Sequence, residues 1–357
     1  MSAKYLLAVL LCVKVIGVAF ATLIFARFTP LVDSELYVKG FYVGEQVSRT
    51  ALIQSLATMA NRVGGAYFAH LTFAFISILG LAYYYLTGGR RWVLMLFLLF
   101  PSALVWTSIV GKEALFFGGF TLLLVVWTRF ATNELTRLDV GAAVVAGAMC
   151  ALLRPHYAVV FIWLFASVAI VKKMGVRAWP FVLLLFLLGA LGVFTTVWDD
   201  LLYKGFGGIE PTARASRFNY FGIEARSDAG FEQFKSMVHL GALLGIVGPM
   251  PVELFARPVF IPFFMEGMLI LLCPCLVYFY ASRQHFLGKE RFYAMFLGCL
   301  LPAILALMVL HAPFGLLNPG SATRWRVNFE AIFYMAPLLL LYAFMDTSRH
   351  ENRSFPS

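Results

Sequence analysis

The sequence predicts an all-α, polytopic integral membrane protein. The chain of 357 residues is 61% hydrophobic and only 13% charged, with a mean hydropathy of +0.84. Soluble globular domains have about 25% charged residues, so that class is excluded. Apolar runs close to the ~20 residues that a helix needs to cross the hydrocarbon core recur along the whole chain. We therefore expect about ten transmembrane helices in a single transmembrane domain over residues 1–357.

The expected spans follow the apolar runs in chain order. They cover residues 5–26, 66–87, 92–110, 114–130, 140–153, 156–171, 178–198, 259–281, 292–311 and 327–345. The fifth and sixth are short and are separated only by Arg154 and Pro155, so they form either a hairpin or broken helices. The first span follows Lys4 and resembles a signal peptide, but its apolar run continues through Phe25, which favours an uncleaved anchor.

The short connections predict the orientation of the chain. Lysine and arginine gather at 88–91, 172–177 and 282–291, and such loops mark the cytoplasmic side. Both termini are then cytoplasmic, and the two long connections, 27–65 and 199–258, are extracytoplasmic loops. The net charge of +10 is in part this topology signal.

The end of the second outer loop, residues 237–256, is apolar but rich in glycine and proline. A full span here would move the basic connection 282–291 to the outside, against the orientation rule. We expect a re-entrant or interfacial segment instead. Irregular backbone at membrane depth is tolerated only inside protein or beside a wet cavity, so this segment predicts a cavity at the outer face.

Two charged residues, Lys14 and Glu266, lie within predicted spans. Such a residue costs about 2.5–3.5 kcal/mol at a helix centre, so each is expected to face the bundle interior and a partner. The sequence leaves open whether they pair with each other, and whether the role is structural or functional.

Several classes of protein are excluded or disfavoured. All five cysteines lie in predicted spans, so neither a disulfide framework nor a zinc site is expected. The chain contains no Walker loop, dinucleotide fingerprint, HExxH motif or G-x-S-x-G elbow. We expect no cofactor and no metal. Basic residues follow the membrane flanks rather than one soluble face, which disfavours nucleic acid as a partner.

Cations lie at the outer ends of four spans, where the orientation rule predicts few of them. They are Lys112, Arg154, Arg257 and the pair Arg324 and Arg326. Arg217 adds a cation in the second outer loop, where mixed charge and aromatic residues suit carbohydrate or an ordinary loop. Each arginine alone is typical of snorkelling to lipid headgroups. Together they predict an anion at the outer boundary, because the planar guanidinium suits phosphate oxygens.

The first outer loop carries two acids, Asp33 and Glu35, directly after the first span. A carboxylate above the membrane surface can deprotonate a sugar hydroxyl as a general base, and His156 is a second candidate. Solvated loop acids are the alternative. Residues 52–60 carry apolar side chains at helical spacing, which predicts an interfacial helix.

Several short stretches resemble bacterial Wzy-type polysaccharide polymerases and neighbouring integral membrane glycosyltransferases. They are Phe100–Ser102, Trp106–Ser108, Gly111–Leu115, Leu153–His156, Gly248–Pro251 and Arg324–Arg326. The resemblance implies substrates on undecaprenyl diphosphate, transfer at the periplasmic face of the bacterial inner membrane, and diphosphate or glycan contacts from Arg154, Arg324 and Arg326. Asp33 and Glu35 are similar in placement to the catalytic acid of GT-C glycosyltransferases.

Three functions remain open from the sequence. The first is a membrane glycosyltransferase or polymerase that uses a polyprenyl-(di)phosphate-linked glycan, with other members of a polysaccharide assembly system and membrane lipid as partners. The second is a transporter or flippase of a lipid-linked saccharide, which should show internal symmetry between its halves. The third is a non-catalytic assembly subunit. Formation of longer product, relocation without new bonds, or neither separates the three.

Overall fold

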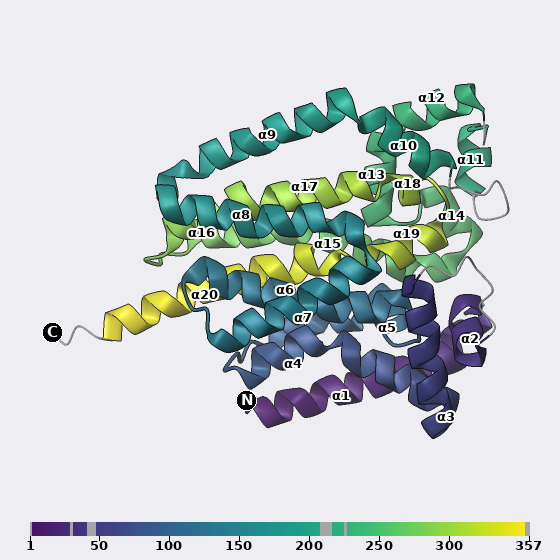
Figure 1. The fold of residues 1–357 in the computed structure, drawn as a ribbon, viewed down its shortest axis with the longest axis horizontal. Helices are drawn as coiled ribbons and strands as arrows, with labels where there is room; N and C mark the ends of the chain where they lie inside the picture. The colour runs from purple at the N-terminus through teal and green to yellow at the C-terminus, as the bar shows by residue number, and fades with distance from the viewer. Residues whose placement is uncertain (1, 29–30, 41–47, 208–215, 225–226, 354–357) are drawn as a thin grey trace. The chain divides into compact units, whose positions relative to one another are not determined.

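The computed structural model is helical in every regular element it describes (Figure 1). It describes residues 2–28, 31–40, 48–207, 216–224 and 227–353, and these contain no β-strand. The all-α prediction is confirmed. The chain forms two compact units. Unit 1 comprises Met1–Ala158 and Val327–Leu339, and unit 2 comprises Val159–Arg326 and Leu340–Ser357.

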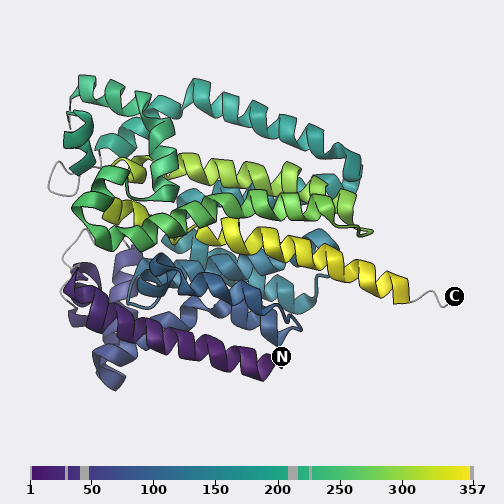
Figure 2. The same ribbon diagram turned by 180° about the vertical axis from the view of Figure 1, so that it is seen from behind.

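Unit 1 contains the N-terminal helices. Their bounds are α1 Ala3–Ala19, η1 Phe20–Ile24, η2 Phe25–Arg27, α2 Val32–Lys39, α3 Ser48–Ser77, α4 Leu79–Leu86, η3 Trp92–Leu99, α5 Pro101–Trp106, α6 Lys112–Thr132, α7 Arg137–Leu153 and η4 Pro155–Tyr157. The unit also holds the first part of α20, Glu330–Arg353. Figure 2 shows α1, in purple, running the length of the unit from the start of the chain towards α2.

Unit 2 contains the remaining helices and the end of α20. Their bounds are α8 Ala158–Met174, η5 Val176–Ala178, α9 Trp179–Thr196, α10 Trp198–Gly207, α11 Ser216–Phe221, α12 Asp228–Ser236, α13 Val238–Val247, α14 Pro251–Ala256, η6 Pro258–Phe260, α15 Ile261–Arg283, α16 Lys289–Met295, η7 Phe296–Leu300, α17 Leu301–Leu310, α18 Ala312–Gly315 and α19 Pro319–Arg326.

The helix lengths support a polytopic membrane protein but not the predicted count of ten. Among the described residues, seven helices are long and apolar enough to cross a membrane, and the pair α3–α4, bent by 53°, would be an eighth. The predicted span 92–110 is divided between η3 and α5, because Phe100 is extended in front of Pro101. The predicted span 140–153 lies in α7, which has 17 residues.

Helix α6 is the core of unit 1. Nearly nine-tenths of its apolar window is buried, and it packs against α3, α4 and α7. Small residues permit this close packing, because a Cβ on Gly118 would lie 2.1 Å from the carbonyl oxygen of Ile76. The interfacial helix predicted over residues 52–60 is part of α3, whose axis breaks at Gly64 and Gly65 just before the predicted span at 66.

The backbone between α5 and α6 is not helical, although it is buried. Other side chains satisfy part of it: Ser34 donates to the carbonyl of Val110 (2.5 Å), and the Val110 N–H donates to Nδ1 of His70 (3.0 Å). Irregular backbone inside a membrane protein requires such partners, because lipid offers none. The contact with Ser34 also fixes α2 against the start of α6.

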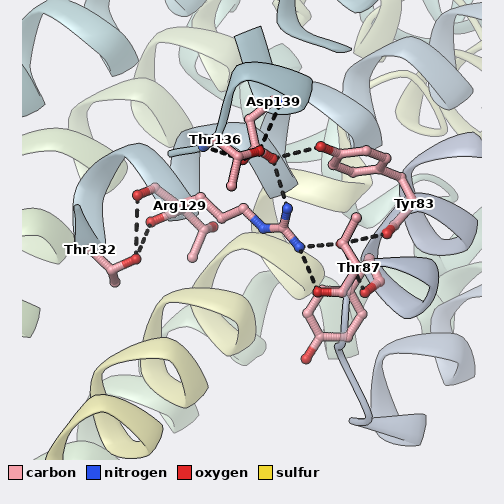
Figure 3. Close-up of polar contacts among 8 residues, drawn as sticks. Tyr83, Thr87, Arg129, Thr132, Thr136 and Asp139 are labelled. Atoms are coloured by element: carbon pink, nitrogen blue, oxygen red, sulfur yellow. Dashed lines mark hydrogen bonds and ion pairs between the residues drawn. The ribbon is translucent and has the colours of Figure 1, made fainter. Parts of the chain in front are cut away.

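A polar network joins α4, α6 and α7 at the far end of unit 1 (Figure 3). Arg129 and Tyr83 both donate to one oxygen of Asp139 (2.7 Å each), and Thr136 forms a capping box with the same carboxylate. Arg129 also donates to the hydroxyl of Thr87. Burial opposes ionisation of Asp139, but the hydrogen bonds from Thr136, Tyr83 and Arg129 outweigh it and lower its pKa to about 2.

Helix α13 of unit 2 is too short to span a membrane. Its 10 residues extend about 15 Å, half of the ~30 Å hydrocarbon core. A Cβ on Gly315 would lie 2.0 Å from the carbonyl oxygen of Gly241, so the backbones of α13 and α18 touch. Gly248 (φ +85°) ends the helix, and α14 follows. This helix, break and short helix agree with the expected interruption of segment 237–256.

Residues 199–236, the first part of the predicted second outer loop, are largely helical where the structure describes them. Helices α10, α11 and α12 surround a small core formed by Phe206, Phe218, Phe231 and Phe234, against which Leu316 packs. The Phe206 and Phe218 rings are stacked with centroids 6.0 Å apart. The sequence description of this stretch as a polar loop with scattered aromatics misses this core.

Candidate functional site

The predicted site residues of unit 1 lie around the start of α6. Glu113 forms an ion pair with Arg154 (3.3 Å), and Lys112 donates to the hydroxyl of Thr50 (3.0 Å). The contact of Ser34 with Val110 brings α2 to the same turn. We call Lys112, Glu113, Arg154, His156 and the α2 acids, Asp33 and Glu35, the α6 cluster. Segments around residues 34, 50, 112 and 154 therefore meet at one place.

The Glu113–Arg154 pair follows from the local structure of two helix ends. Glu113 lies in the first turn of α6, whose N-cap, Gly111, offers no side chain, and its carboxylate folds back over that glycine. Arg154 is the C-cap of α7, where Pro155 prevents the helix from continuing. An anion at a helix N-terminus and a cation at a C-terminus both complement the helix dipoles. Both side chains are less than 10% exposed, so the charges attract in a medium of low dielectric.

The three predicted catalytic residues differ in their surroundings. Asp33 is half-buried, while Glu35 is 62% exposed and pairs with Lys39 one turn further along α2 (3.5 Å). His156 is exposed, lies within electrostatic range of Arg154 and Arg49, and has its ring 4.9 Å from that of Tyr157. The structure thus places His156 near Arg154 and Arg49, and it places α2, which carries Asp33, near the start of α6. The catalytic roles of these residues stay predictions.

Arg217 holds the backbone of unit 2 together. It is 1% exposed, donates to both carboxylate oxygens of Glu253 (2.8 and 2.5 Å), to the carbonyl of Gly248 (2.6 Å) and to that of Gly315. A bidentate arginine–carboxylate pair is among the strongest hydrogen-bonded arrangements. These protein acceptors give Arg217 a structural role, and its predicted contact with substrate stays a prediction.

Arg326 binds the same stretch of backbone. Its guanidinium is fully buried, pairs with Glu266 (3.0 Å) and donates to the carbonyls of Ile246 (2.7 Å) and Val247 (3.3 Å). With Arg217 on Gly248, two arginines bind three successive carbonyls at the C-terminus of α13. Those carbonyls have no partner within the helix, and cations are favoured at this end.

The remaining predicted cations of unit 2 are more accessible. Arg257 is exposed at the end of α14, and Arg324 is half-buried in α19. Trp325 beside it stacks on Phe314, with ring centroids 3.8 Å apart and planes inclined by 13°. The structure gives each intramembrane charge a partner within its own unit. Lys14 donates to the hydroxyl of Thr107, and Glu266 pairs with Arg326.

Sequence reasoning missed the acidic partners of these arginines. The sequence assigns no role to Glu113, beside Lys112, or to Glu253. The sequence does carry a signal for Glu253, which lies three residues after Met250, the N-cap of the helix that begins at Pro251. Among the described residues, no group of three or more histidine, cysteine, aspartate or glutamate side chains is arranged to hold a metal ion.

Comparison with known proteins gives no match. No protein-family model, curated protein or solved structure shows significant similarity to the chain. The resemblance to Wzy-type polymerases and GT-C glycosyltransferases therefore has no support from these comparisons.

Proposed function

We propose that this membrane-embedded protein transfers a sugar or oligosaccharide from a polyprenyl-(di)phosphate carrier at the outer face of the bacterial inner membrane, with both termini in the cytoplasm. The observation that carries the proposal is the α6 cluster. Lys112 of α6, Arg154 at the end of α7 and the exposed His156 lie close to one another where predicted spans end, and α2, which carries the two acids, contacts the same turn through Ser34. A lipid-linked diphosphate has its charge at that boundary and its isoprenoid chain in the hydrocarbon.

Glycosyl transfer requires two functions from such a cluster, a general base and a stabiliser of the leaving group. An acceptor hydroxyl attacks the anomeric carbon, and a base takes its proton; half-buried Asp33 is our first choice, before Glu35 and His156. The bond to the carrier breaks, and cations stabilise the departing diphosphate. Arg154 is suited to the second task, because Glu113 fixes the orientation of its guanidinium before substrate arrives. Lys112, the residue directly before Glu113, adds a second positive charge for the diphosphate.

The test is activity of the purified protein, reconstituted in vesicles, on a lipid-linked repeat unit. Longer product supports the proposal. Relocation of the intact substrate across the membrane would instead indicate a flippase, and neither result would indicate an assembly subunit. Either of these two results, without any longer product, would exclude the glycosyltransferase assignment.

Variants of the acids and of Arg154 refine the test. Asp33→Asn keeps nearly the same shape but cannot accept a proton, so we expect binding without turnover; Glu35→Gln is the matched control. Arg154→Lys keeps a charge for Glu113 but loses the planar fork, so we expect folded protein with strongly reduced turnover. Full turnover in the folded Arg154→Lys and Asp33→Asn variants would exclude the assigned roles.

A further inference from the structure

A second polar group lies inside unit 1, apart from the α6 cluster. It consists of Lys14 on α1, Thr107 and Ser108 in the non-helical stretch after α5, and Glu330 at the start of α20. All four side chains are fully buried. Lys14 and Glu330 both belong to helices long and apolar enough to cross a membrane. Ionisable residues at such positions are rare and mark sites of function by default.

Lys14 interacts with the hydroxyl of Thr107 and with the charge of Glu330. Its ammonium donates to the Thr107 hydroxyl, which in turn donates to the carbonyl of Ala103. Helix α1 packs against α3, α4, α5 and η3. Glu330 approaches from α20, because Tyr334, one turn after it, packs on Phe97 and Phe100 in front of α5 (ring centroids 5.9 and 5.5 Å), and its charge acts on Lys14. The stretch after α5 presents the hydroxyls of Thr107 and Ser108.

Ser108 packs against the face of α1 that carries Lys14. Its Oγ is 2.4 Å from the position that a Cβ would take on Gly17, and Gly17 follows Lys14 by one turn. Within the part of the chain that the structure describes, this buried hydroxyl has no hydrogen-bond partner. A buried hydroxyl without a partner costs about 1–3 kcal/mol, so such groups in native proteins usually bind ordered water.

We propose that Lys14, Ser108 and Glu330 enclose an internal water site through which a proton passes between the ammonium and the carboxylate. The surroundings meet the requirement for buried water, which needs two to four polar partners. In the transfer, an N–H bond of Lys14 breaks and its proton goes to water, while water gives a proton to Glu330. The pair changes from two charges to a neutral amine and a carboxylic acid, with no net change in protons. A low dielectric medium favours the neutral form.

Replacing Ser108 by alanine distinguishes a hydrated site from a dry one by the sign of its effect. If the hydroxyl binds water that links the two charges, Ser108→Ala lowers the unfolding temperature of the detergent-solubilised protein. In a dry site the same change removes an unsatisfied polar group and leaves the unfolding temperature unchanged or higher. Ser77→Ala is the matched control, because Ser77 is also fully buried in unit 1 but donates to the carbonyl of Ala74 (2.6 Å).

Infrared spectroscopy tests the proton directly. We expect a carboxylic acid C=O band in the wild-type protein that shifts to lower frequency in D2O and is lost in Glu330→Gln. Glu113→Gln, which alters the other glutamate that is buried among the described residues of unit 1, should keep the band. A wild-type protein without a Glu330-dependent band, or with a band that does not shift in D2O, would overturn the proposal. So would a Ser108→Ala variant at least as stable as wild type.

Discussion

Replacing Arg326 by methionine should destabilise the protein severely, although methionine has a similar length and suits an apolar interior. The change leaves the carboxylate of Glu266, 1% exposed, without its guanidinium and removes the donors from two carbonyls at the end of α13. Breaking a buried ion pair from one side costs about 3–5 kcal/mol. Each buried carbonyl that loses its donor adds about 1–3 kcal/mol, although the losses are not strictly additive. We therefore expect a loss of at least ~3 kcal/mol.

The assay is equilibrium unfolding by SDS in mixed micelles, which gives the free energy of unfolding. Arg257→Met is the control, because Arg257 is an exposed arginine of the same unit and should change stability little. The double variant Arg326→Met/Glu266→Leu should recover part of the loss, since no buried charge remains unpaired, but not the part due to the carbonyls. A stability of Arg326→Met equal to that of Arg257→Met would refute the structural role of this arginine. Normal stability with lost activity would instead favour the substrate contact that the sequence suggests.

Two further predictions concern unit 1. The pKa of Asp139, about 2 in the folded protein, lies below the ~3.9 of an unfolded chain. The carboxylate therefore stabilises the fold fully above about pH 4, and this contribution is lost as the pH falls towards 2. The free energies of unfolding of wild type and Asp139→Asn should converge over that pH range. A constant difference between them would contradict the network. Gly65 has φ +78° and ψ 179°, a conformation nearly reserved for glycine, so Gly65→Ala should cost about 1–3 kcal/mol. Gly141→Ala, in the open face of α7, should stabilise slightly, and equal effects of both alanines in the same SDS titration would refute the role of the α3 break.

Much of the fold could be predicted, because the requirements of membrane insertion are visible in the amino-acid composition. A helix that crosses hydrocarbon needs a long apolar run, and the long helices from α6 to α20 coincide with such runs. Residues 92–110 form one apolar run as well, yet the structure breaks it at Phe100. Hydropathy does not register a proline that turns the chain while keeping it buried. The α10–α12 core is hidden from the sequence for a related reason, because polar residues separate its phenylalanines along the chain.

The site was predictable only as a list of charges. The sequence shows that Arg154, Arg217 and Arg326 lie at unusual positions, but it does not show what they bind. All three have a glutamate partner in the structure: Glu113, Glu253 and Glu266. These partners are 41, 36 and 60 residues away along the chain, so no local spacing rule finds them. Long-range pairing of charges is a property of the packed structure.

The two arginines that bind the C-terminus of α13, Arg217 and Arg326, also have a consequence for the synthesis of unit 2. Helix α13 is made before residue 248 leaves the ribosome, yet its terminal carbonyls receive one of their donors from Arg326, almost eighty residues later. Arg217 emerges earlier, but its own acceptor on Gly315 is also made late. A short apolar helix with exposed carbonyls cannot settle in lipid by itself. We therefore expect a growing chain to keep this segment out of the hydrocarbon core until Arg326 is made.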